Sequence, residues 1–158
     1  MSIPIVRRAL LGALVTSGLA ISLIAGPASA GSLDVVASFT AKVSQLDVAT
    51  FTDPNQKSTV GLLGISKSNS IAFGADQWKS LIELVRKAAA AQAPAAWTEA
   101  GSMKDVSRDT ATLAVSSGPG LRFVISSAKG GSVSHILPKA DIARLEKALQ
   151  QVGERLSN

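Results

Sequence analysis

The chain contains no cysteine and no tyrosine, and His135 is its one histidine. The lack of cysteine excludes disulfides, thiolate nucleophiles and cysteine metal ligands, so stability must come from packing or from a partner. A lone histidine without a nearby ligand residue also argues against a metal site. From the residues present, we predict no catalytic, cofactor-binding or metal-binding site.

Motifs for the common enzyme classes are missing as well. No G-x-S-x-G or S-x-x-K motif stands in a setting typical of a serine nucleophile. The glycine-containing segments 118–120 and 130–131 lack the spacing of a phosphate-binding loop, and neither precedes a helix directly. We interpret both segments as hairpin turns.

The first thirty residues have the pattern of a cleavable bacterial-type signal peptide. Arg7 and Arg8 precede an uncharged apolar run over 9–25, and Ala28-Ser29-Ala30 places small residues at the cleavage positions. The apolar run is about 17 residues long, which is the lower limit for spanning a bilayer, so a retained anchor is the weaker alternative. We expect cleavage after Ala30 and a mature periplasmic or secreted protein that begins at Gly31.

The pattern of the first thirty residues leaves two export routes to compare. The arginine pair partly resembles a twin-arginine signal, but Val6 stands where such signals usually have serine or threonine. We therefore favour the general secretory route. Two of the 16 basic residues and none of the 11 acidic residues lie in the first thirty, so residues 31–158 keep a net charge of +3. This charge is ordinary for one domain and does not by itself indicate a nucleic-acid binder.

The first half of residues 31–158 shows strand patterns followed by a helix pattern. We predict a loosely held lead-in over 31–36, then strands over 37–51, 59–66 and 71–73, with a slip in the alternation near Gln45. A helix should follow from Asp76 to about Gln92. Its predicted apolar stripe consists of Trp78, Leu81, Ile82, Val85, Ala88 and Ala89.

The second half repeats this order. We predict strands over 104–116, 121–126 and 133–137, followed by a helix that starts near Pro138. The predicted apolar stripe of this last helix consists of Ile142, Leu145, Leu149, Val152 and Leu156. Its heptad-like spacing is too short to hold a dimer alone, but the end from Val152 to Leu156 leaves a homodimer open.

The two halves predict one mature domain built from two similar β-β-β-α units, at about 37–92 and 100–157. The fold class should be α+β, with an antiparallel sheet of about six strands and two helices packed on one of its faces. A chance similarity of two strand-and-helix segments is the alternative to an internal repeat.

Three functions remain open. The first is a non-enzymatic binding or structural protein whose partner is an unknown protein or small molecule. The second is an enzyme with His135 as acid or base, although a histidine between Val133 and Leu137 on a strand is typical of a half-buried position.

The third function is single-strand binding. The layout of strands followed by one helix, repeated once, resembles the Pur and Whirly single-strand-binding proteins in topology alone. Such binders need basic and aromatic residues on an open sheet face. The basic candidates Lys42, Lys57, Arg108, Arg122 and Lys129 are scattered, and Phe39, Phe51 and Phe123 suit the core. We therefore place nucleic acid last.

Overall fold

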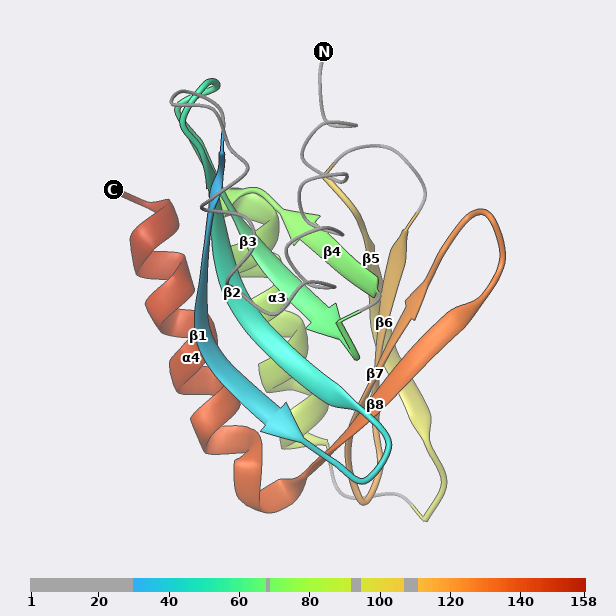
Figure 1. The fold of residues 1–158 in the computed structure, drawn as a ribbon. Coiled ribbons are helices and arrows are strands. Elements are labelled where there is room, and N and C mark those ends of the chain that lie inside the picture. The colour runs from blue at the N-terminus through green and yellow to red at the C-terminus, as the bar shows by residue number, and fades with distance from the viewer. Residues whose placement is uncertain (1–29, 68, 92–94, 107–110) are drawn as a thin grey trace.

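The structure is a computed structural model that describes residues 30–67, 69–91, 95–106 and 111–158 (Figure 1). In this part of the chain the fold is α+β, with two four-stranded antiparallel sheets and two α-helices. The first sheet consists of β1 (Ser32–Thr40), β2 (Gln45–Asp53), β3 (Ser58–Ile65) and β4 (Asn69–Phe73), and α3 (Ala75–Ala90) follows it. The second sheet consists of β5 (Thr98–Lys104), β6 (Thr112–Ser117), β7 (Gly120–Ser126) and β8 (Ser132–Pro138), followed by the 3-10 helix η1 (Lys139–Asp141) and by α4 (Ile142–Leu156).

The prediction of about six strands in one sheet was wrong, because each half has a further strand at its start. The supposed lead-in and the segment 37–51 form β1 and β2, and the slip near Gln45 is a turn in which the Ala41 amide donates to the Ser44 carbonyl. In the second half, the segment 104–116 holds the end of β5 and most of β6. The chain order of four strands and one α-helix thus occurs twice among the described residues, and its origin by duplication stays a prediction.

The two missed strands are both edge strands, and both are irregular. The pairing register shifts between Val35 and Ala37 in β1, and between Glu99 and Gly101 in β5. A bulge breaks the two-residue alternation that identifies a strand in a sequence. An edge strand also has fewer buried positions: Phe39 is the one buried residue of β1, and no residue of β5 is buried.

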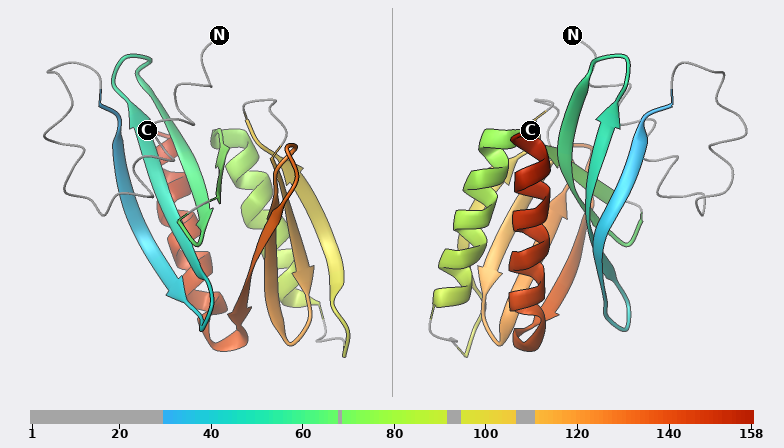
Figure 2. Two further views of the ribbon diagram at one scale, coloured as in Figure 1. Left: turned by 45° about the vertical axis from the view of Figure 1, so that its right-hand side comes forward. Right: turned by 90° about the vertical axis from the view of Figure 1, so that its left-hand side faces the viewer.

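Each helix packs mainly against the sheet of the other half. Helix α3 follows the first sheet but lies against β5, β6 and β7, whereas α4 follows the second sheet and lies against β1, β2 and β3. The helices also contact each other and lie side by side (Figure 2). The indole Nε1 of Trp78 on α3 donates to the Leu149 carbonyl of α4 at 2.8 Å. Because each helix packs mainly on the sheet of the other half, the two halves share one core.

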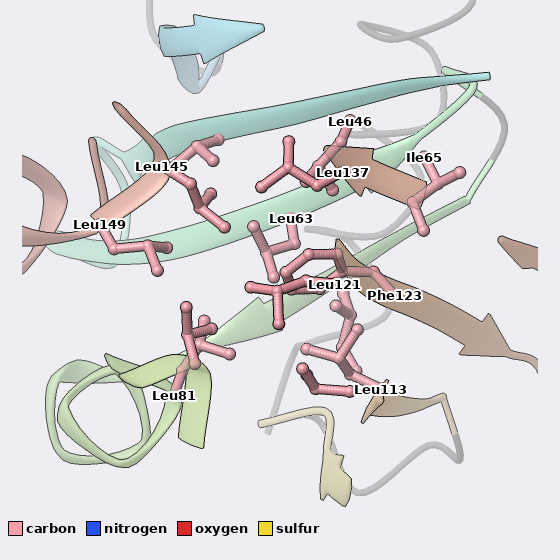
Figure 3. Close-up of a cluster of buried hydrophobic side chains, with 14 of the residues drawn as sticks. Leu46, Leu63, Ile65, Leu81, Leu113, Leu121, Phe123, Leu137, Leu145 and Leu149 are labelled. Carbon is pink, nitrogen blue, oxygen red and sulfur yellow. The ribbon is translucent and has the colours of Figure 1, made fainter. Parts of the chain in front are cut away.

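The core fills the space between the helices and the inner faces of both sheets (Figure 3). Both predicted helix stripes are confirmed in their centres, because Trp78, Leu81 and Val85 on α3 and Leu145 and Leu149 on α4 are buried. The strand residues of the core include Leu46, Leu63, Ile65, Leu113, Leu121, Phe123 and Leu137. A smaller cluster of Ala49, Phe51, Leu62 and Ala72 occupies the opposite face of the first sheet, with Leu33, Val60 and Val106 packed against it.

The predicted signal peptide, apart from Ala30, lies outside the described residues. Among the helices of the described part, none is long and apolar enough to cross a membrane.

Candidate functional site

His135, the residue proposed from the sequence as an acid or base, lies on β8 where the two sheets meet. Its side chain is 1% exposed, and its Nδ1 atom is hydrogen-bonded to the Ser44 hydroxyl at 3.0 Å. Ser44 belongs to the turn between β1 and β2, so this hydrogen bond connects the first sheet with the second. A buried imidazole with a hydrogen-bond partner is typical of a structural role.

Two carboxyl groups also surround this histidine. Asp47 on β2 accepts hydrogen bonds from the Ser38 hydroxyl at 2.5 Å and from Gln45 Nε2 at 2.7 Å. Asp141 lies at the end of η1. Burial lowers the pKa of His135 below its ordinary value, and the negative charges of Asp141 and Asp47 offset only part of this effect. The structure therefore favours the neutral imidazole.

This lowered pKa makes stability depend on pH. As the pH falls, the unfolded chain binds the proton at about the ordinary pKa of 6.5, before the folded state does. The stabilising contribution of neutral His135 is therefore complete above that pH and is lost as the pH falls through the lower pKa of the folded state. We expect the free energy of unfolding, measured by urea titration, to decrease from pH 7.5 to pH 5.5 by at most about 1.4 kcal/mol per pH unit.

The chain offers a clean control for this measurement, because it has no other histidine. A His135→Gln variant should be less stable at pH 7.5, and its free energy of unfolding should change little down to pH 5.5. A wild-type protein with constant stability over this range would contradict the assignment of a buried neutral imidazole.

The geometry around His135 gives limited support for catalysis. The fold places it beside a serine, as the enzymatic alternative requires, but a base must reach the proton that it abstracts from a bound reactant. The imidazole is almost fully enclosed, and the neighbouring Val43 at the tip of the turn is 93% exposed, so Ser44 lies next to a protruding turn. Within the described residues, no three His, Asp or Glu side chains are grouped as a metal site would require.

A second candidate site lies on the outer face of the second sheet. Because strand side chains alternate, the neighbours of the core residues on β6, β7 and β8 point away from the helices. We call this surface the open face; it consists of Glu99, Ser102, Lys104, Thr112, Ala114, Ser116, Arg122, Val124, Ser126, Ser132, Ser134 and Ile136. Both helices lie on the other side of the sheet (Figure 2).

Arg122 and Trp97 form the distinctive feature of the open face. The guanidinium carbon of Arg122 lies 5.2 Å from the centre of the Trp97 ring, within the range of a cation–π interaction. The indole packs so closely on Gly118 that a Cβ atom there would lie 2.5 Å from the ring, so only glycine allows this position. The Arg122 Nε atom is buried and has no hydrogen-bond acceptor in the described part of the chain.

The neighbours of Arg122 do not neutralise its charge. Ser116 on β6 and Ile136 on β8 lie opposite Arg122 on the two adjacent strands. The ion pairs among the described residues join Lys79 to Asp76 and Arg155 to Asp34, so neither involves Arg122. Arg122 is thus a cation held in place by an aromatic ring, with no carboxylate partner in the described part of the chain.

The other candidates for single-strand binding do not share this face. Phe39 and Phe123 belong to the main core, and Phe51 belongs to the smaller cluster. Lys42, Lys57 and Lys129 are exposed residues of hairpin turns, and Arg108 lies outside the described residues.

Sequence reasoning did not identify Trp97 as a site residue. The available signal was a large aromatic residue directly before the missed strand β5, and its pairing with the 117–120 turn is visible only in three dimensions. Comparison of the sequence with models of known protein families and with curated proteins finds no match.

Proposed function

We propose that this chain is an exported, non-enzymatic binding protein, and that the open face of its second sheet binds an acidic polypeptide segment of a partner. The observation that supports this proposal is the Arg122 guanidinium, which is stacked on Trp97 and lacks an anionic partner among the described residues. Export remains the expectation from the signal-like first thirty residues. It agrees with the start of β1 at Ser32, because cleavage after Ala30 leaves this strand intact.

The chemistry of arginine indicates a carboxylate as the group that is bound. A guanidinium offers its N–H donors in a planar fork that matches the two oxygens of a carboxylate. The stacking on Trp97 restrains the Arg122 side chain before any ligand arrives, which reduces the entropy lost on binding. Because the Nε atom is buried, a carboxylate would have to bind through the other N–H groups of this guanidinium.

The rest of the open face favours an extended polypeptide. Next to the row of Ser116, Arg122 and Ile136 lies a row of small side chains, Ala114, Val124 and Ser134. A row of hydroxyl groups follows, formed by Thr112, Ser126 and Ser132. Small side chains let a backbone approach a sheet closely, and hydroxyls can donate to or accept from peptide groups. Lys104 at one end of β5 adds a second positive charge, and Glu99 near the other end, opposite Ser116, adds one negative charge two strands away from Arg122.

The test measures binding of a fluorescein-labelled glutamate-rich peptide by fluorescence anisotropy, with the exported protein as the sample. We expect Arg122→Gln to weaken binding about tenfold or more, because hydrogen bonds to charged groups contribute roughly 1.5–3 kcal/mol. The matched control is Lys129→Gln, which removes the same charge from the exposed turn between β7 and β8 and should change affinity less than about twofold. The intact mass of the sample shows whether it begins at Gly31.

Three results would contradict the proposal. The first is wild-type protein that does not bind the peptide, and the second is equal loss of affinity in both variants. The third is binding of the same peptide with glutamine in place of glutamate as tightly as the original. Tighter Arg122-dependent binding of oligo(dT) than of the peptide would instead favour the single-strand-binding alternative, whose affinity should fall steeply with salt.

A further inference from the structure

The two sheets have four outer strands, β1, β4, β5 and β8, and each outer strand presents unpaired backbone groups unless something caps them. Side chains of α4 cap β1. Arg144 Nη2 donates to the Ser38 carbonyl at 2.7 Å, and its guanidinium lies 4.3 Å from the centre of the Phe39 ring. Arg155 of the same helix forms an ion pair with Asp34. The outer edge of β1 is therefore occupied by charged side chains of α4.

Helix α3 caps β5 in a corresponding way. Gln77 Nε2 donates to the Lys104 carbonyl at 3.2 Å, and Lys87 Nζ lies 3.5 Å from the Ala100 carbonyl. The bulge between Glu99 and Gly101 adds an irregularity that opposes pairing with another strand. Thus β1 and β5, the first strand of each sheet, are both irregular and both capped from a helix.

The chain itself covers β4. The Val106 amide donates to the Ala72 carbonyl at 2.9 Å, and the Ala72 amide donates to the Asp105 carboxylate at 3.3 Å. Both backbone groups of Ala72, the fourth of the five residues of β4, therefore have partners from the segment that follows β5. Three of the four outer edges are thus capped within the described residues.

The outer edge of β8 differs from the other three. Its sequence, Ser132–Pro138, contains no charged residue, and no hydrogen bond among the described residues caps its outer edge. Ser132 and Ser134 are exposed, and Ile136 is 49% exposed, one of the few large apolar side chains on the described surface. The β7–β8 hairpin extends at the right of Figure 1, away from α4. Charges, proline within the strand and bulges are the usual protections of an edge strand, and β8 has none of them before its final residue.

We propose that β8 pairs with the β8 strand of a second copy of this chain, antiparallel across a twofold axis. An identical strand suits this edge because a twofold axis makes it self-complementary, and an uncharged strand meets no repulsion from its copy. The exposed Ile136 side chains would then lie at the new seam. The two second sheets would become one eight-stranded sheet.

This dimer would use a surface other than the end of the last helix. In the structure Val152 is buried and Leu156 is partly buried against the core, so the helix end is largely occupied within one copy. The β8 dimer does not depend on the proposed ligand. It would, however, place two Arg122 sites on one continuous open face, because Arg122 lies on β7, one strand away from the edge.

A cross-linking experiment tests the pairing directly, because the chain has no cysteine that could interfere. Single-cysteine variants Ser132→Cys, Ser134→Cys and Ile136→Cys cover the register of β8. We expect at least one of them to form an intermolecular disulfide under mild oxidation. Ser102→Cys, an exposed position on the opposite edge strand of the same sheet, is the control and should remain largely reduced. Equal cross-linking of the control and the β8 variants, or no cross-linking in any variant, would overturn the proposal.

Sedimentation of the cysteine-free protein gives the second test. We expect a dimer with a dissociation constant on the order of 10 μM, since a single strand pair forms a small interface. Ile136→Lys should shift the protein to monomer at 50 μM without changing its circular dichroism spectrum, because this position is exposed. Val43→Lys introduces the same charge at an exposed valine of the β1–β2 turn and should leave the dimer intact. A wild-type monomer at 200 μM, or monomers from both variants, would refute the β8 interface.

Discussion

Trp78→Ala should lower the free energy of unfolding by about 3–5 kcal/mol, the usual range for removal of a large buried aromatic side chain. Trp78 is fully buried between α3, α4 and the first sheet, and its ring centre lies 6.3 Å from that of Phe73. A Cβ atom on Gly61 would lie 2.2 Å from the indole, so the ring packs directly on the β3 backbone. The variant also leaves the Leu149 carbonyl without the indole donor.

Urea unfolding measured by circular dichroism would test this expectation, with Trp97→Ala as the matched control. Trp97 is only partly buried at the outer surface of the second sheet, so its loss should cost clearly less than the loss of Trp78. Equal losses of stability in the two variants would mean that Trp78 is not a centre of the core.

Leu145→Asp should abolish folding. Leu145 is fully buried on the face of α4 that packs against the first sheet, so aspartate would place a carboxylate without a partner in the core. Such a charge, together with the lost apolar contacts, costs more than the roughly 5–15 kcal/mol by which a domain is stable. We expect a circular dichroism spectrum of an unfolded chain and no cooperative thermal transition.

Ala143→Asp provides the control for this variant. Ala143 is exposed in the first turn of the same helix, where a negative charge interacts favourably with the helix dipole. This variant should remain folded with a nearly unchanged midpoint of unfolding. If Leu145→Asp were folded and stable, the packing of α4 on the first sheet would be incorrect.

At the candidate site, the sequence indicated the burial of His135 but not its hydrogen-bond partner. The position of His135 between Val133 and Leu137 on a strand predicted a half-buried histidine, and the structure buries it further. Its partner Ser44 is 91 residues away in the sequence, so no local pattern could indicate their hydrogen bond. The same applies to Arg122 and Trp97, which are separated by the missed strand β5 and by β6.

The sequence by itself determined the elements whose periodic pattern is strong. The apolar stripes of α3 and α4 and the strands β3, β4, β7 and β8 follow from local spacing, because one face of each element must be buried. The absence of cysteine chemistry is equally a property of the sequence alone.

Only the tertiary structure decided how these elements combine. It divided the strands into two sheets and added the irregular edge strands β1 and β5, whose bulges disrupt the alternation that a sequence can reveal. It also placed each helix against the sheet of the other half. Such pairings join residues far apart in the chain, and they depend on which surfaces fit together rather than on any local preference, so they leave no periodic signal in the sequence.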